Sequence, residues 1–229
     1  MSRALLAALL IGYTSLWAGF QVYPIRVYLD PETPVATVKV TNQSEEKRSF
    51  EVETMRWTQD ANGSDRYDKD ASLLAVPLLF TLEGKASQTV RITDLSPTGK
   101  KAQSAYRLFI SELPAKHAEE TGGLHMLFRV AIPVFITTAA STETLLTLDT
   151  IEKSPTTFNC WLRNDSSHFV RISKLYLVTA DGEHGVQVEP AKYLLPGSKA
   201  SFNFTLDPGF TPSALHIFLE DGQRIELAI

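Results

Sequence analysis

The side chains that most often catalyse reactions or bind metal ions are scattered along this chain. The five histidines show no pairing at metal-ligand spacing, and a single cysteine cannot supply a thiolate cluster. No Gly-x-Ser-x-Gly elbow, glycine-rich phosphate loop or His-Glu-x-x-His sequence occurs. A triad built from distant residues leaves no local signature, but each acid and histidine stands in a polar turn or at a strand edge. We therefore expect no enzyme, with no catalytic residue, no metal site and no cofactor.

The single cysteine, Cys160, excludes an intramolecular disulfide, so the core must stabilise the fold. Its neighbours Phe158 and Trp161 predict that Cys160 is a small buried apolar residue. A reactive or intermolecular thiol is the alternative, which needs an exposed and polar setting.

The most distinctive chemistry is that of a long apolar strand edge. Gly122 to Ile132 has nearly unbroken β-propensity, and no proline occurs before Pro133. Because side chains alternate along a strand, four apolar residues share one face. They either fill the domain's own core or form an edge that another chain joins. Natural proteins usually protect such edges, and only Arg129 interrupts this one, so the second interpretation is favoured. The four residues are Leu124, Met126, Phe128 and Val130.

Short strands with period-two alternation must position this edge. In 50–57, Phe50 and Val52 face one way while Glu51 and Glu53 face the other. Many such strands separated by turns predict an all-β sandwich architecture. No segment of a dozen residues keeps a helical period, so helices are expected only as one-turn connectors, best placed at 95–103.

The chain divides near Thr137–Glu143, where small residues follow the apolar strand. A second series of strands then begins, and it closes in a hairpin of 216–219 and 224–227. We predict a signal peptide at 1–18, a first domain at 19–137 and a second at 143–229. The competing architecture is one continuous large sandwich.

The first eighteen residues resemble a secretory signal. Arg3 precedes an apolar stretch from Ala4 to Trp17, shorter than the ~20 residues that span a bilayer. Cleavage is expected near Ala18, which leaves an exported chain with no integral membrane span. The formal net charge of −4 and the lack of a basic run indicate no nucleic-acid partner.

The order of motifs between Val22 and Ile136 resembles the first domain of the periplasmic chaperones that assemble pili through an outer-membrane usher. The ending Ile132-Pro133-Val134-Phe135 is similar to the branch often called archaic. The resemblance rests on seven motifs, which are Val22–Leu29, Val38–Ser44, a strand ending in Trp57, Pro77–Gly84, Thr89–Ile92, Tyr106–Pro114 and Arg129–Ile136. It implies two immunoglobulin-like β-sandwich domains in an L or boomerang arrangement.

The resemblance also implies a function and its partners. Such a chaperone binds pilus or fimbrial subunits in the periplasm and delivers them to the usher. It donates its last first-domain strand to a subunit that lacks one, the mode known as donor-strand complementation. Leu124, Met126, Phe128 and Val130 match this donor strand.

A basic anchor for the subunit's terminal carboxylate is the second element that the resemblance implies. Arg26, within Pro24-Ile25-Arg26-Val27, matches the family's arginine. The partner cation in many members is a lysine near the end of the donor strand, and the nearest cation here is Arg129.

Two positions depart from the best-known branch, in which an interdomain ion-pair network joins two acids and an arginine. Gln103 and Phe135 stand at two of these places, and only Asp221 resembles the third member. We therefore expect the network to be absent.

A secreted two-domain adhesin or carbohydrate-binding module is the alternative function. It requires exposed aromatic residues, whereas Trp57 and Trp161 lie in alternating strands where burial is expected.

Overall fold

The computed structural model describes residues 19–95, 103–114, 126–137, 143–179 and 182–229, with the backbone alone for 182–191. Every regular element within these ranges is a β-strand, and none is a helix. This confirms the predicted all-β class. Most of the connector expected at 95–103 lies outside the described residues.

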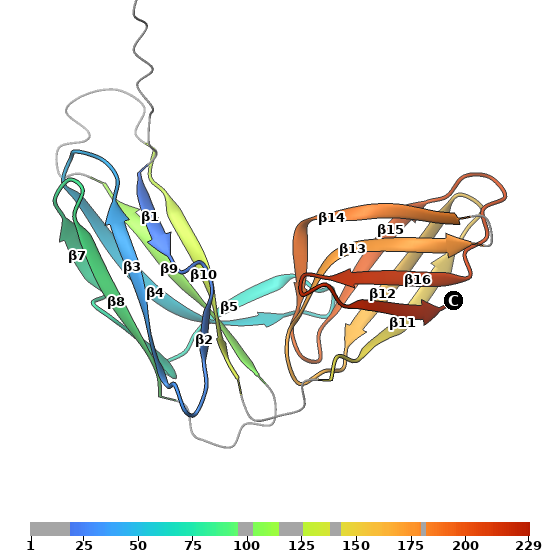
Figure 1. Ribbon diagram of the computed structural model, residues 1–229, viewed down its shortest axis with the longest axis horizontal. Helices are drawn as coiled ribbons and strands as arrows, with labels where there is room; N and C mark the ends of the chain where they lie inside the picture. The colour runs from blue at the N-terminus through green and yellow to red at the C-terminus, as the bar shows by residue number, and fades with distance from the viewer. Residues whose placement is uncertain (1–18, 96–102, 115–125, 138–142, 180–181) are drawn as a thin grey trace, which may run out of the picture.

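Two sheets form the first domain (Figure 1). One sheet has the order β1 (Phe20–Tyr23), β3 (Val35–Asn42), β8 (Ser87–Asp94), β6 (Leu73–Val76). The other has the order β2 (Val27–Leu29), β10 (Arg129–Ile136), β9 (Ser104–Leu113), β4 (Arg48–Gln59), β5 (Asp65–Lys69), with β7 (Leu79–Leu82) also paired to β4.

Alternation along the strands builds the first core, as the sequence predicted. On β4, Phe50 and Val52 are buried, and Glu51 between them is exposed. Burying each such apolar side chain contributes roughly 1.5–3 kcal/mol. Val38, Ile92 and Ile110 complete the same core from both sheets.

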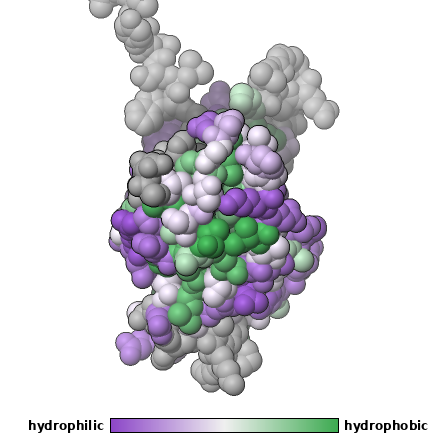
Figure 2. Space-filling view, turned by 90° about the vertical axis from the view of Figure 1, so that its right-hand side faces the viewer, coloured by the Kyte–Doolittle hydropathy of each residue, from purple (hydrophilic) through white to green (hydrophobic). Residues whose placement is uncertain are grey.

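The second domain is also a pair of sheets. One has the order β11 (Leu146–Lys153), β12 (Thr157–Asn164), β15 (Lys199–Thr205). The other has the order β14 (Gly182–Leu194), β13 (Val170–Thr179), β16 (Ala214–Leu219), β17 (Arg224–Ala228). The predicted closing hairpin is β16–β17. At the outer end of this domain, apolar side chains gather in the centre with polar side chains around them (Figure 2).

Cys160 is fully buried in the second core, which confirms its predicted role. Desolvation raises the pKa of its thiol to about 12.

The two sandwiches meet at a bend, and none of the four sheets takes strands from both (Figure 1). This arrangement replaces the single large sandwich that was the competing architecture. A third apolar cluster fills the junction, with Trp57 and Phe135 from the first domain and Leu195, Phe169 and Tyr193 from the second. The side chain of Gln59 donates to the Tyr193 carbonyl and accepts from the Leu195 amide, both at 2.9 Å.

A buried asparagine holds the same kind of turn in each domain. Asn42 donates to the Glu46 carbonyl, and its own side-chain oxygen accepts from the Ser44 amide. Asn164 donates to the Leu194 carbonyl and accepts from the Ser166 amide. The two domains therefore share a local device that only the structure makes visible.

Candidate functional site

The predicted donor strand only partly overlaps β10: Val130 lies in β10, whereas Met126 and Phe128 precede it in residues that are not part of a strand. The outer edge of β10 is largely open. β10 pairs with β9 along its whole length, but it pairs with β2 only at Val134–Ile136. Among the described strands, none pairs with the outer side of 129–133. The outward-facing amide and carbonyl groups of this stretch, apart from the proline nitrogen, can therefore pair with another strand, while the others are bonded to β9.

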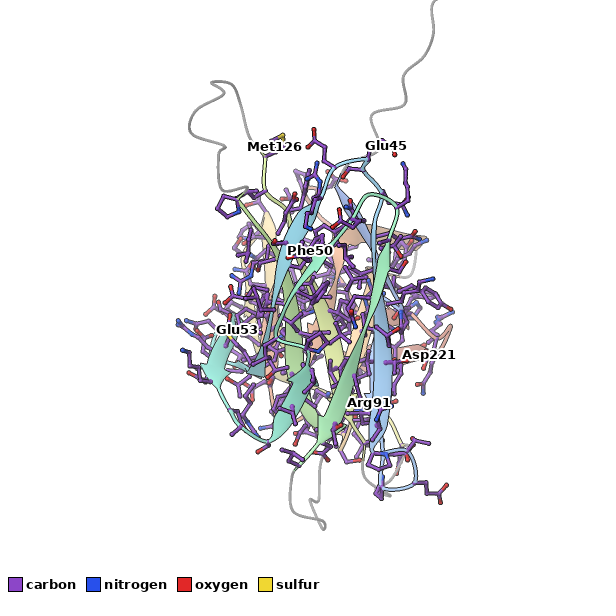
Figure 3. All side chains as sticks on the ribbon, turned by 90° about the vertical axis from the view of Figure 1, so that its left-hand side faces the viewer. Glu45, Phe50, Glu53, Arg91, Met126 and Asp221 are labelled. Atoms are coloured by element: carbon purple, nitrogen blue, oxygen red, sulfur yellow. The ribbon has the colours of Figure 1, made fainter. Side chains whose placement is uncertain are left out.

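The apolar row changes from exposed to buried along the chain. Met126 precedes β10 and is 63% exposed, at the same end of the first domain as Glu45 (Figure 3). Phe128 is half-buried against Gly19, where a methyl group would lie 3.0 Å from the ring. Val130 packs in part on the first core. Leu124 lies outside the described residues, so the row is described for three of its four members.

Arg129 lies apart from Arg26. Val27 is opposite Val134, so Arg26 lies near Pro133, about four positions or roughly 13 Å from Arg129 along the strand. The guanidinium of Arg129 donates to Glu53 at 3.3 Å and lies 4.0 Å from the Phe109 ring centre. The structure therefore does not bring the two predicted anchor cations together.

Arg26 lies at the junction and is paired within the chain. Its Nη2 donates to Glu220 Oε2 at 2.9 Å, and its Nη1 donates to the Tyr28 hydroxyl at 3.4 Å. The guanidinium carbon lies 5.6 Å from the centre of the Tyr193 ring. Burial by itself lowers the pKa of Arg26, but the contacts with Tyr28 and Tyr193 give a net rise. Arg26 is therefore a permanent cation.

Two further arginines that the sequence analysis did not select surround Tyr193. Arg171, on β13, also donates to Glu220, and its guanidinium lies 5.1 Å from the Tyr193 ring. Arg107, on β9 opposite Pro133, lies 3.8 Å from the Trp57 ring and 5.8 Å from that of Tyr193. Their signal in the sequence was a charge inside a strongly apolar strand, with Arg107 directly before Leu108 and Arg171 between Val170 and Ile172.

The three guanidinium groups are incompletely satisfied. The Nε atoms of Arg26, Arg107 and Arg171 are buried and have no hydrogen-bond partner in the described part of the chain. Glu220 is the one carboxylate that bridges Arg26 and Arg171 there. A cleft of about 400 Å³ adjoins this pair and is lined by residues of both domains, including Gln103, His168 and Asp221. The site is suited to an anion.

The interdomain contacts differ from the expected pattern in one respect. Gln103 accepts a hydrogen bond from the Phe169 amide at 3.0 Å, and the ring of Phe135 stacks on that of Phe169 at 3.8 Å. Neutral contacts thus occupy these two positions, as the sequence analysis expected. However, an interdomain ion pair does exist, and its acid is Glu220. Asp221 instead accepts from the Gln223 amide within its own turn.

Three observations on the described residues bear on other kinds of site. They contain no group of three His, Cys, Asp or Glu side chains placed to hold a metal ion. Trp57 is 2% exposed and Trp161 half-buried, so neither offers the open aromatic face that the adhesin alternative requires. Within the same ranges, no helix has the length and apolar character needed to cross a membrane.

Residues 19–142 match the family model described as the pili and flagellar-assembly chaperone, PapD N-terminal domain. The match covers more than half of the chain, which therefore belongs to this family of pilus-assembly chaperones. The chain is also 27% identical over 132 residues to the chaperone protein FocC of Escherichia coli. That alignment covers 56% of this chain and 55% of its relative, so it spans about half the length of the curated relative.

Solved structures of the same class share the fold along nearly the whole chain. A pre-assembly complex of CsuC with the tip subunit CsuE, from archaic pili of Acinetobacter baumannii, matches with a TM-score of 0.69 and 19% identity. The match covers 91% of this chain and 98% of the other. The complex of SafA pilin with the SafB chaperone from Salmonella enterica matches with a TM-score of 0.62 and 15% identity, over 92% and 96% of the two chains. These likenesses confirm two immunoglobulin-like domains in a bent arrangement.

Proposed function

We propose that this protein is a periplasmic chaperone that binds pilus subunits by donating the edge of β10 and passes them to an outer-membrane usher. The observation that carries the proposal is the open edge at 129–133 beside an arginine-rich cleft between the domains. An added strand would pair with this edge, and its terminal carboxylate would bind Arg26. Residues 1–18 would direct export and be removed.

The apolar row supplies the binding energy in this proposal. Met126 and Phe128 retain exposed surface, and Leu124 extends the row by sequence. Each large side chain moved from water into a subunit groove contributes roughly 1.5–3 kcal/mol before ordering costs. Val130 is already partly used by the chaperone's own core, so we expect it to contribute least.

For Arg129 we propose a role other than that of a carboxylate anchor. Arg129 is the first residue of β10, at the start of the open edge, where it pairs with Glu53 and contacts Phe109. There it would meet the middle of the added strand and not its terminus. Arg26 is the residue placed to bind the carboxylate.

The test is to co-express the tagged protein with the pilus subunits encoded beside it and to recover complexes from the periplasm. We expect Arg26→Ala and Phe128→Asp to leave the protein folded and to reduce the recovered complex. Losing one partner of a desolvated charge pair costs about 2–5 kcal/mol of binding, and an unpaired charge cannot enter an apolar groove.

Matched controls separate binding from general damage. Arg91→Ala removes an exposed arginine from the opposite sheet (Figure 3), and Leu79→Asp adds an acid at an exposed apolar site on β7. Both should keep wild-type complex levels. Wild-type recovery with folded Arg26→Ala and folded Phe128→Asp would refute strand donation through this edge. If both variants unfold, these residues belong to the protein's own core.

A further inference from the structure

The arginine proposed to bind the client carboxylate is already paired with a carboxylate of the chain itself. Glu220 binds Arg26 of the first domain through both oxygens, at 2.9 and 3.3 Å. It also accepts from Arg171 of the second domain. This carboxylate, held between two guanidinium groups, has the geometry that a peptide C-terminus would adopt there.

We propose that Glu220 is an internal competitor, which a client's C-terminal carboxylate must displace to bind Arg26 and Arg171. The inference rests on the proposed function and adds two residues to it. Arg171 becomes the second anchor cation, supplied by the second domain. Because the client must outcompete Glu220, this residue would determine how much more tightly a free C-terminal carboxylate binds than an uncharged chain end.

Glu220 is placed to leave the site. Its side chain is 40% exposed, and it stands at the start of the turn between β16 and β17. Rotation of its side chain would put the carboxylate in water, where it is well solvated. The arginines are fixed more firmly, since each side chain is three-quarters buried and packs near Tyr193.

The exchange also bears on the contact between the domains. The Arg26–Glu220 pair joins the two domains in the free protein. A client carboxylate bound to Arg26 and Arg171 would join them equally well, because the two arginines come from opposite domains. Client binding would therefore replace this interdomain bridge without opening the junction.

Peptide binding tests the proposal. The probe is a synthetic peptide of the last residues of the co-purifying subunit, made with a free C-terminal carboxylate and as the amide. We expect Glu220→Gln to bind the free-carboxylate peptide about tenfold more tightly, because the competing charge is gone. The amide should bind the variant and the wild type equally. Arg171→Ala should weaken only the free-carboxylate peptide.

Asp221→Asn is the matched control, since it removes one negative charge from the same cleft without touching the arginines. An equal gain with Asp221→Asn, or no gain with Glu220→Gln, overturns the proposal. Glu220→Asp, whose carboxylate is withdrawn by one methylene, should give an intermediate affinity and provides a second variant if Glu220→Gln is unstable. If Arg26→Ala binds normally, the proposed function fails; if Arg26→Ala weakens binding while Glu220→Gln has no effect, only this inference fails.

A separate observation concerns Glu112, which lies on β9 and is close in space to Gly19, the first described residue. Glu112 is 7% exposed, and its Oε1 is bound to Arg48. Its Oε2 is buried and has no partner among the described residues. A methyl group at Gly19 would lie 3.7 Å from this Oε2, so Gly19 lies beside it. Because buried polar atoms are normally hydrogen-bonded, we expect a hydrogen-bond donor beside this carboxylate oxygen.

We infer that the α-ammonium group created at Gly19 by signal-peptide cleavage is this donor. The uncleaved chain has a neutral amide at that position, with one hydrogen and no charge. The Gly19 carbonyl accepts from the Gln43 amide at 3.2 Å, which holds the residue in place. The ion pair would tie the start of β1 to β9 beside Phe128, whose carbonyl accepts from the Glu112 amide at 2.9 Å. Removal of the signal would thus stabilise the base of the donor strand.

The test compares a chain that begins at Gly19 with one that keeps Ala18, each with Glu112 or Glu112→Gln. We expect the extra residue to lower the ratio of folded to unfolded protein about tenfold when Glu112 is present and little in Glu112→Gln. Additive effects of the two changes, or a mature N-terminus at another residue by mass spectrometry of the exported protein, would overturn the inference.

Discussion

At the scale of single residues, burial decides the chemistry of the most reactive side chain. The Cys160 thiol lies in the second core, and desolvation holds its pKa near 12, far above its ordinary value. The thiolate, which is the reactive form, is therefore almost absent from the folded protein at neutral pH.

This residue gives a prediction about pH. Because the folded-state pKa is raised, the unfolded chain loses its thiol proton first. Stability is thus complete below the unfolded-state pKa near 9 and falls as the pH rises from there towards about 12. Relative to Cys160→Ala, the wild type should lose free energy of unfolding between these pH values, as measured by urea titration. A parallel dependence in both proteins would contradict this prediction, as would rapid iodoacetamide labelling of the folded wild type at pH 8.

At the scale of elements, the asparagine turns hold the ends of neighbouring strands and their connections together. Asn164 donates to the carbonyls of His168 and Leu194, while its oxygen accepts from the Ser166 amide. The His168 and Ser166 groups belong to a connection and the Leu194 carbonyl to the last residue of β14, and without Asn164 these polar atoms would be left unpaired. Asn42 has the corresponding contacts in the first domain.

Asn164→Ala should lower the free energy of unfolding by more than about 2 kcal/mol, because each buried group left unpaired costs ~1–3 kcal/mol. Asn159→Ala, at a half-buried position on the same strand, is the control and should cost clearly less. Chemical denaturation measures both. Equal losses would show that the turn contacts are not the stabilising feature.

At the scale of the whole molecule, the junction decides whether the two domains act as one body. Phe135 is fully buried there, stacks on Phe169 at 3.8 Å and lies against Trp57 and Tyr193. The same junction positions Arg26 against Glu220 and Arg171. The arginine site therefore exists only while the domains keep this packing.

Phe135→Ala should remove about 3–5 kcal/mol of packing free energy from the junction. We expect calorimetry to show less cooperative unfolding of the domains, and small-angle scattering to show a wider spread of shapes. Phe218→Ala, at a half-buried site on β16 whose ring contacts Tyr176, serves as the control and should leave the coupling intact. A single unchanged transition in Phe135→Ala would indicate that other contacts hold the junction.

The strands, the cores and the family could be predicted from the amino-acid sequence, because they follow from local patterns. The period-two alternation placed Phe50 and Val52 on one face of their strand, and the neighbours Phe158 and Trp161 predicted a buried Cys160. The structure buries all three of Phe50, Val52 and Cys160. Asn42 and Asn164 escaped notice, since turn asparagines are common and their buried partners lie at distant points of the chain. The fourth residue of the apolar row, Leu124, remains a prediction from the sequence.

Which charges meet became apparent only in the folded molecule. Arg26 and Glu220 are 194 positions apart, and their contact depends on the packing of two domains. Arg129 was the nearest cation to the end of the donor strand in sequence, yet the register of β10 places it beside Glu53. Arg107 and Arg171 reach Tyr193 from different domains. Alternation specifies the face on which a side chain lies, whereas strand register and domain packing specify its partner across the chain.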